Sequence, residues 1–258
     1  MKTSYGLARL YFKKEYYQLS KDNYIKILNS HKERMPDEDL EQIYCALGEI
    51  SLKLNQLDDA RNYFEKTLAI NPANVWAVEQ LLAEAEKRND TQGVVKYRYE
   101  LVKLKADPFE KFAILLETAD IYKERLKNNH GAVAAIKEAL RYNPTSKIAL
   151  LKLFEIYFEL GSTEDAIGIL GRLAEAEESK EKRALHYLRI AAIYREQLKN
   201  DLKAAEFFNL VLDTDFEKLE AFRAIDEILT KLKDWEALAR SYRAMIERIR
   251  GKGFNDLE

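Results

Sequence analysis

The sequence predicts an all-α fold, a solenoid of about seven stacked antiparallel helix pairs. The first observation is the spacing of the four prolines, which lie 36 residues apart at Pro36, Pro72, Pro108 and Pro144. Proline lacks a backbone N–H and clashes with the preceding turn, so it ends one helix or opens the next. Stop signals at a fixed period of about 20–50 residues are typical of stacked helical repeats.

The second observation is the composition. Of the 258 residues, 33% are charged and 47% are hydrophobic, with only 9 glycines and 4 prolines. That mixture favours amphipathic helices and is poor in the turn residues that a sheet protein needs. No linker divides the chain, so we expect a single repeat domain over residues 1–258.

The third observation is an internal repeat of 72 residues, or two proline intervals. Residues 121–124 read Ile-Tyr-Lys-Glu and return at residues 193–196 as Ile-Tyr-Arg-Glu. A small residue opens each expected second helix, at Ala60, Val94, Ala132, Ala166, Ala204 and Ala237. The intervals between these residues alternate between shorter and longer, so the unit is a helix pair that occurs in two lengths.

Each pair carries two stretches with apolar residues at i, i+3, i+4 and i+7, the pattern of an amphipathic helix. In the second pair, Leu47, Ile50 and Leu54 line the first helix, and Phe64 and Leu68 line the second. A pair of this size cannot bury its apolar stripe alone, so neighbouring pairs must stack. In order, the pairs are expected at residues 3–34, 38–71, 74–106, 109–143, 145–178, 181–214 and 217–249.

The last helix ends the stack and has no following pair to cover it. It carries Leu238, Tyr242, Met245 and Ile246, whereas the terminal repeat of a free-standing solenoid has a polar outer face. We therefore expect an exposed apolar strip on this helix. It would serve self-association, or contact the next repeat of a longer protein of which the chain is a fragment.

Charge and hydropathy exclude several classes of function. The formal net charge of −2 provides no basic field for nucleic acid or for an anionic membrane. No apolar run approaches the roughly 20 residues of a membrane span. The first residues break their apolar positions with charges, unlike the core of a secretory signal. We therefore expect a cytoplasmic protein that binds no nucleic acid.

No constellation of residues points to catalysis, a metal or a cofactor. Cys45 is the only cysteine, and the three histidines, His31, His130 and His186, lie far apart in the sequence. Paired His or Cys spacings typical of metal sites and glycine-rich phosphate loops do not occur in the sequence. We expect a protein that is not an enzyme, with no catalytic residue, no metal and no cofactor.

The residues of the second pair resemble the tetratricopeptide repeat. Leu47-Gly48, Ala60, Phe64 and Pro72 match its consensus residue types at the consensus intervals. The fourth and sixth pairs resemble it through Ala119, Tyr122, Ala132, Ala139 and Pro144, and through Ala191, Tyr194, Ala204 and Phe208. The resemblance implies a right-handed superhelix whose first helices line a concave groove that holds a partner segment.

Carried over position by position, the family's groove falls on apolar and charged residues of the first helices. The positions are Glu49, Leu116, Asp120, Lys123, Glu124, Leu151, Glu155, Phe158, Glu159, Leu188, Arg195 and Glu196. An apolar stripe rimmed by carboxylates suits a protein or peptide segment with apolar anchors and basic residues. The alternative is that the acidic residues only keep this face soluble.

The resemblance thus implies a non-catalytic scaffold for protein–protein interaction. Family members that bind chaperones clamp a terminal carboxylate with Lys and Asn, but Cys45 and Glu49 hold those places here, which disfavours that role. Two alternatives stay open: a peptide-sensing regulatory repeat protein, and an RNA-processing helical repeat protein. The sequence shows no effector module for the first, and the acidic middle repeats disfavour the second.

Overall fold

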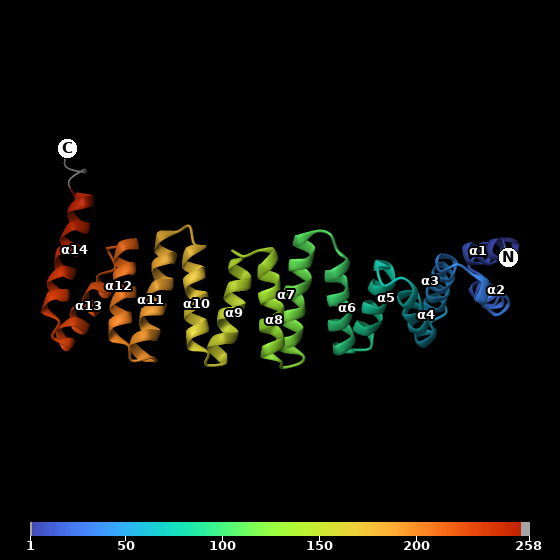
Figure 1. Cartoon of the computed structure of the whole chain (residues 1–258), viewed down its shortest axis with the longest axis horizontal. Coiled ribbons are helices and arrows are strands. Elements are labelled where there is room, and N and C mark those ends of the chain that lie inside the picture. The colour runs from blue at the N-terminus through green and yellow to red at the C-terminus, as the bar shows by residue number, and fades with distance from the viewer. Residues whose placement is uncertain (1, 254–258) are drawn as a thin grey trace. The chain divides into compact units, whose positions relative to one another are not determined.

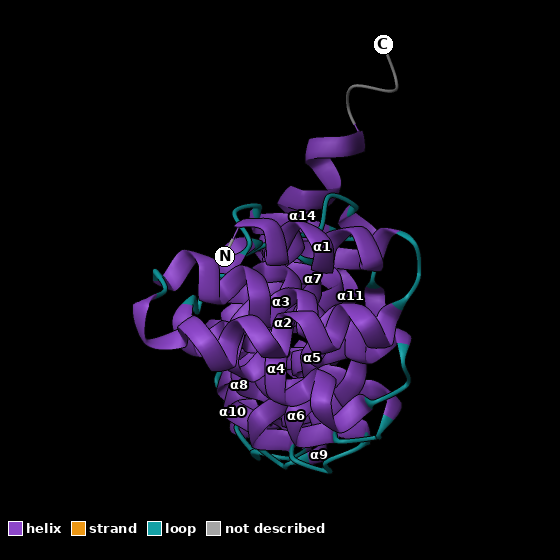
Figure 2. Ribbon diagram, turned by 90° about the vertical axis from the view of Figure 1, so that its right-hand side faces the viewer, coloured by secondary structure: helices purple, strands orange, loops and turns teal. Residues whose placement is uncertain are grey.

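The computed structural model describes residues 2–253, and over these residues it contains helices and short connections but no strand (Figure 2). The all-α fold expected from the sequence is confirmed. In chain order the elements are α1 (Lys2–Lys13), α2 (Tyr17–His31), the 3-10 helix η1 (Lys32–Arg34), α3 (Asp37–Lys53), α4 (Leu57–Ile70), α5 (Val75–Lys87), α6 (Thr91–Leu104), α7 (Pro108–Glu124), α8 (Asn129–Tyr142), α9 (Lys147–Glu159), α10 (Thr163–Glu175), α11 (Lys180–Glu196), α12 (Asp201–Thr214), α13 (Leu219–Leu232) and α14 (Trp235–Gly253).

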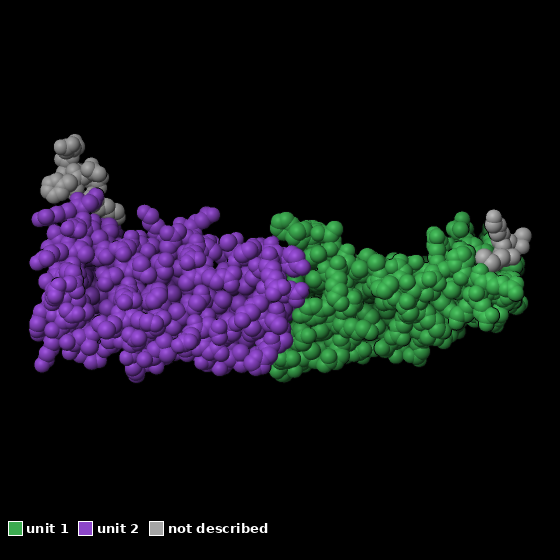
Figure 3. All heavy atoms as spheres, in the orientation of Figure 1, with its two compact units in different colours: residues 1–128 green, residues 129–258 purple. Residues whose placement is uncertain are grey.

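The chain divides into two compact units (Figure 3). Residues 1–128 form the first unit, with α1 to α7, and residues 129–258 form the second, with α8 to α14. Within each unit, helices that follow one another in the sequence pack side by side (Figure 1). The single domain over residues 1–258 stays a prediction.

The first helices of the pairs alternate in length. Helices α3, α7 and α11 have 17 residues each, whereas α5 and α9 have 13. This alternation explains why the sequence repeats after 72 residues rather than after one pair. No helix within the described residues combines the length and the apolar character that crossing a membrane requires.

Prolines and capping residues set the ends of the helices as expected. Pro36 immediately precedes α3, and Pro108 is the first residue of α7. The Asp107 carboxylate accepts a hydrogen bond from the backbone N–H of Phe109 at 2.9 Å and so satisfies a free donor at the start of α7. Proline at the first helical position loses no hydrogen bond, so the two residues together fix this boundary.

The small residues that open the second helices lie where neighbouring helices pack. Ala60, Val94, Ala132, Ala166 and Ala204 are all 0–1% exposed, whereas Ala237 is half-buried. Larger side chains at these positions would push the helix axes apart. The interval pattern read from the sequence therefore marks buried positions in both units.

The last helix differs from the expectation at Met245. Leu238 and Met245 are seven residues apart and share the face that packs on the core of the second unit, where Met245 is only 6% exposed. Tyr242 and Ile246 project from a different face and are 46% and 48% exposed. The exposed apolar strip of α14 therefore excludes Met245, and its members are Trp235, Tyr242, Ile246 and Ile249.

Within residues 2–253, seven turns contain one residue each with a left-handed backbone. These residues are Glu15, Asn55, Asn89, Lys127, Gly161, Lys199 and Lys233, with φ from 50° to 68°. Only one of them is glycine, the residue that adopts this conformation without steric cost. The other six turns are therefore strained by a β-carbon.

Replacing Lys233 by glycine is expected to raise the free energy of unfolding by about 0.5–1 kcal/mol, because its left-handed backbone disfavours a β-carbon. The turn itself needs no change, since the backbone N–H of Asp234 already donates to the carbonyl of Leu229 at 3.0 Å. Urea denaturation measures the effect. Arg223→Gly, at an exposed position inside α13, is the control and should lose about 1 kcal/mol. A loss of stability in Lys233→Gly would contradict the assignment.

Candidate functional site

A hollow of about 510 Å3 opens in the first unit, and it is lined by residues of α1, α2, α3 and α5. Four of its ten lining residues are aromatic: Tyr5, Phe12, Tyr24 and Trp76. Aromatic side chains that line a concave surface are typical anchors for a partner's apolar groups.

The helical periodicity of α1 and α3 places the lining residues. On α1, Tyr5, Arg9 and Phe12 follow the i, i+4, i+7 spacing that puts three side chains on one helical face. The Tyr5 hydroxyl donates to Oε1 of Gln42 on α3 at 3.1 Å, and its ring meets Tyr24 edge-on at 5.7 Å. These contacts tie the first helix pair to α3 and fix one wall of the hollow.

The opposite wall is held at the start of α5. Trp76 packs edge-on against the buried ring of Phe64, with the ring centroids 5.3 Å apart. Beside it, the Asn74 side-chain amide donates to Oε1 of Glu41 at 2.7 Å and to Sγ of Cys45 at 3.8 Å. These contacts orient Trp76 and the Cys45 thiol before any partner binds.

The hollow carries charges of both signs and a single thiol. Arg9 and Lys13 come from α1, and Glu49 comes from α3. Burial raises the pKa of the Cys45 thiol, although the hydrogen bond from Asn74 opposes the shift, so the thiol stays protonated. Burial also raises the pKa of Tyr24 to about 12. The arrangement suits binding of an apolar side chain flanked by charges rather than nucleophilic chemistry.

The groove positions expected from the sequence fall in both units. Glu49 lines the hollow of the first unit. On α7 of the same unit, Leu116, Asp120 and Lys123 are half-buried and Glu124 is exposed. The remaining positions lie on α9 and α11 of the second unit.

On α9, the expected residues form one exposed face. Leu151, Glu155, Phe158 and Glu159 are all exposed, and Phe158 is 56% exposed with its ring 5.9 Å from that of Phe154. Phe158 therefore presents an apolar surface on the same helix face as two carboxylates. The sequence reading missed the exposed Ile148, which lies one helical turn before Leu151 and extends the apolar part of this face.

On α11, the expected residues are less available. Leu188 is half-buried against the core of the second unit. The Arg195 guanidinium forms an ion pair with the Glu227 carboxylate of α13 at 2.8 Å, so a partner would have to compete for it. Glu196 is exposed. Among the expected groove residues of this unit, those that a partner could reach are therefore mainly those of α9.

The aromatic lining of the first unit is the main feature that the sequence reading missed. Tyr5, Phe12 and Trp76 were not among the expected groove residues. The spacing of Tyr5 and Phe12 by seven residues was a usable signal, since it puts both on one face of a helix. The same spacing is typical of core residues, and only the contacts with α3 and α5 distinguish the two cases.

Two segments match models of a protein family. Residues 41–74 match a model described as tetratricopeptide repeat, and residues 125–189 match a second model with the same description. These segments of the chain are therefore tetratricopeptide repeats. The matched segments include the second pair and the end of the fourth, where the sequence alone already resembled this repeat. The family match indicates a protein–protein interaction scaffold.

Several solved structures match the chain at low sequence identity. The crystal structure of MamA protein is 18% identical with a TM-score of 0.37, over 71% of this chain and 96% of that chain. The structure of Naa15/Naa10 bound to HypK-THB is 15% identical with a TM-score of 0.48, over 96% of this chain and 36% of that chain. YrrB, described as a TPR protein with an unusual peptide-binding site, is 13% identical with a TM-score of 0.37, over 78% of this chain and 96% of that chain. A sequence comparison with curated proteins found no match.

Within residues 2–253, no three His, Cys, Asp or Glu side chains form a group that could hold a metal ion. His31 and His130 are exposed, whereas His186 of α11 is half-buried and its buried Nδ1 has no hydrogen-bond partner. Burial lowers the pKa of His186, and the neighbouring Arg189 lowers it further, while Glu177 opposes the shift. The imidazole therefore resists protonation in the folded protein.

Stability is expected to fall as the pH drops below about 6.5, because the unfolded chain then takes up a proton that folded His186 resists. Thermal unfolding at neutral and mildly acidic pH measures the effect in wild type and in His186→Gln. The variant should lose less stability than wild type over this interval, since it has no imidazole to protonate. An equal loss in both proteins would show that other groups cause the pH dependence.

Proposed function

We propose that the chain is a non-catalytic scaffold that binds segments of partner proteins on the faces of its first helices. The aromatic hollow of the first unit supports this proposal most directly. Aromatic and Arg side chains are the groups enriched at binding hot spots, and here Phe12, Trp76 and Arg9 line one concave surface. Their positions are fixed by contacts within the unit, which lowers the entropic cost of binding.

The charges indicate what the partner segments carry. In the first unit, Arg9 and Lys13 favour an acidic group and Glu49 favours a basic one, on either side of an apolar side chain. In the second unit, Glu155 and Glu159 beside Phe158 favour a basic segment with an apolar anchor. The proposed ligands are therefore short stretches of protein with alternating apolar and charged residues.

The test of this proposal uses Cys45, the only thiol of the chain, as a reporter inside the hollow. Partners recovered by affinity purification are identified by mass spectrometry, purified and titrated against wild type and Phe12→Ala. Phe12→Ala should weaken binding by about tenfold or more if Phe12 is a hot spot. The bound partner should also slow alkylation of Cys45.

Phe109→Ala is the matched control, because Phe109 belongs to the same unit but lies outside the hollow. It should bind partners as wild type does. The proposal fails if every purified partner binds Phe12→Ala as tightly as wild type and leaves Cys45 open to alkylation. Circular dichroism of both variants excludes unfolding as the cause of lost binding.

Self-association through α14 is a separate prediction. Its exposed strip includes Tyr242 and Ile246, and an antiparallel second copy of α14 would place Glu236 of one chain near Arg250 of the other. Sedimentation velocity should show a dimer whose dissociation is promoted by Ile246→Glu. Leu210→Glu, at an exposed position on α12, should leave the dimer intact. A monomer at every wild-type concentration would contradict the prediction.

A further inference from the structure

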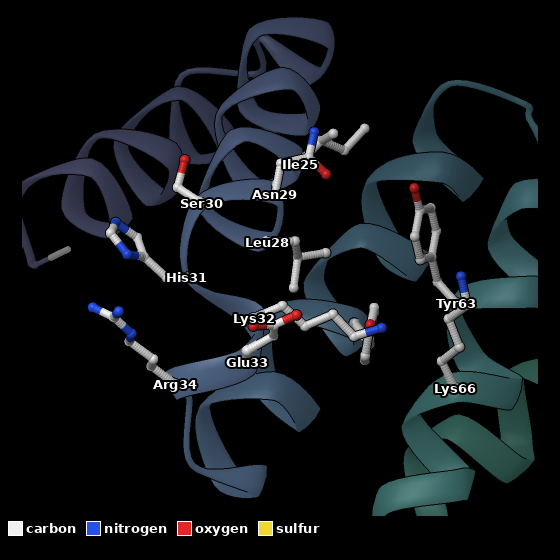
Figure 4. A pocket seen from close by; sticks show the side chains of 11 residues that line it. Ile25, Leu28, Asn29, Ser30, His31, Lys32, Glu33, Arg34, Tyr63 and Lys66 are labelled. Carbon is white, nitrogen blue, oxygen red and sulfur yellow. The ribbon is translucent and has the colours of Figure 1, made fainter.

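A second hollow, of about 700 Å3, lies in the first unit against α2, η1 and α4 (Figure 4). Its apolar wall consists of Ile25 and Leu28 on α2, Tyr63 on α4, and the buried ring of Tyr44 on α3. The residues that line it are all different from those that line the aromatic hollow at α1, α3 and α5. The unit therefore has two separate concave surfaces.

This second surface is basic. Lys32, Arg34 and Lys66 line it together with His31, and Glu33 is its only carboxylate. Among the described residues, no ion pair involves Lys32, Arg34 or Lys66. Cations that outnumber the neighbouring carboxylates raise the local potential and attract an anion.

The nearby Lys21, unlike Lys66, forms an ion pair. Its side chain is buried, and its ammonium lies 2.6 Å from the Asp59 carboxylate and is fully compensated. The Lys66 ammonium instead lies 5.7 Å from the ring centroid of Tyr44 and 5.5 Å from that of Tyr63. Aromatic faces hold a cation in place without neutralising its charge. Lys66 is therefore positioned and still available to an anion.

The cations are spread along the hollow rather than gathered at one point. Figure 4 shows His31 and Arg34 at one end, Tyr63 and Lys66 at the other, and the Lys32 side chain extending between them toward α4. A single small anion could contact only some of these cations. A peptide with successive carboxylates could contact all of them, and one of its apolar side chains could pack on Ile25 and Leu28.

We infer that this surface, formed by α2, η1 and α4 around Lys32, Arg34 and Lys66, binds an acidic peptide segment of a partner protein that carries an apolar anchor. Charge complementarity selects this occupant, since three cations that form no ion pair line the hollow beside a single carboxylate. The apolar wall and the small number of cations favour a protein over a nucleic acid, whose binding needs many phosphate contacts. The surface extends the proposed scaffold function beyond the faces of the first helices.

The test uses a fluorescein-labelled peptide with four glutamates around a central leucine, titrated with the full chain by fluorescence anisotropy. Two further probes have the same length: a peptide with glutamine in place of glutamate, and a single-stranded RNA oligonucleotide with four phosphates. The glutamate peptide should bind more tightly than either probe. Its affinity should fall as salt is added, because exposed charge pairs are screened.

The decisive variant is Lys32→Glu with Arg34→Glu. Both residues are exposed and neither belongs to the hydrophobic core around Tyr24 and Leu47, so the fold should survive the change. The double variant should weaken binding of the glutamate peptide by about tenfold or more. Lys53→Glu with Lys87→Glu makes the same change in net charge at exposed positions outside the hollow and should have little effect.

Three results would overturn the inference: tighter binding of the glutamine peptide or of the RNA, wild-type affinity in the Lys32→Glu and Arg34→Glu variant, or equal weakening in the control. Lys66→Gln tests the cation on α4 separately, and this variant should also weaken binding of the glutamate peptide. Phe12 lines the aromatic hollow and not the basic one, so Phe12→Ala should leave binding of the glutamate peptide unchanged. Failure of the inference is thereby distinguished from failure of the proposed function.

Discussion

Phe64→Ala is expected to lower the free energy of unfolding by about 3–5 kcal/mol, because it removes a large, fully enclosed side chain. Phe64 is 1% exposed, and its ring fills the space between Gly48 of α3 and Trp76 of α5. Urea denaturation followed by circular dichroism measures the loss. Phe109→Ala, at a position that is 74% exposed, is the control and should change stability by less than about 0.5 kcal/mol.

In Phe64→Ala, unfolding should begin near the substituted residue, since each helix pair contacts mainly its neighbours. Hydrogen exchange is therefore expected to accelerate first in α3, α4 and α5. Gly48→Ala tests the same contact from the other side, because a β-carbon there would lie 2.5 Å from Cε1 of Phe64. Gly48→Ala should lower the free energy of unfolding by about 1–3 kcal/mol through overpacking. The same substitution should cost less in the Phe64→Ala background. Additive losses would show that the two sites do not share this contact.

The contact between Gly48 and Phe64 also shows how much the sequence could predict. Both residues fall at consensus positions of the repeat, so the pair of helices and their close approach follow from sequence spacing alone. The helix ends follow too, because Pro108 and Asp107 act through local backbone chemistry. Features fixed by the repeat consensus, or by neighbours within about four residues along the chain, were therefore predictable.

The sequence does not predict which face of a helix packs against which neighbouring helix. Met245 and Ile246 are adjacent and equally apolar, yet only Met245 reaches the core of the second unit. The aromatic residues of α1 have the same spacing whether they line a core or a hollow. Lys32 and Lys66 are 34 residues apart, and only the packing of α2, α3 and α4 brings them to one surface. Long-range contacts, rather than local propensity, decide these cases.

Reversing the charge of α9 is expected to have the largest effect on partner binding in the second unit. Glu155→Lys with Glu159→Lys changes two exposed carboxylates that lie four residues apart on one helical face. If a basic segment binds there, the variant should repel it, and the wild-type affinity should weaken as salt is added. Titration calorimetry with a purified partner measures both effects.

Phe158→Ala separates the apolar part of this interaction from the charges. Because Phe158 is 56% exposed, its removal should cost little stability, while a hot-spot role would cost about 2 kcal/mol or more of binding free energy. The charge reversal should mainly slow association, and the loss of the anchor should mainly speed dissociation. Glu175→Lys with Glu178→Lys, at exposed positions away from α9, is the matched control. Wild-type affinity in both α9 variants would rule out this face and leave the aromatic hollow of the first unit as the binding surface to pursue.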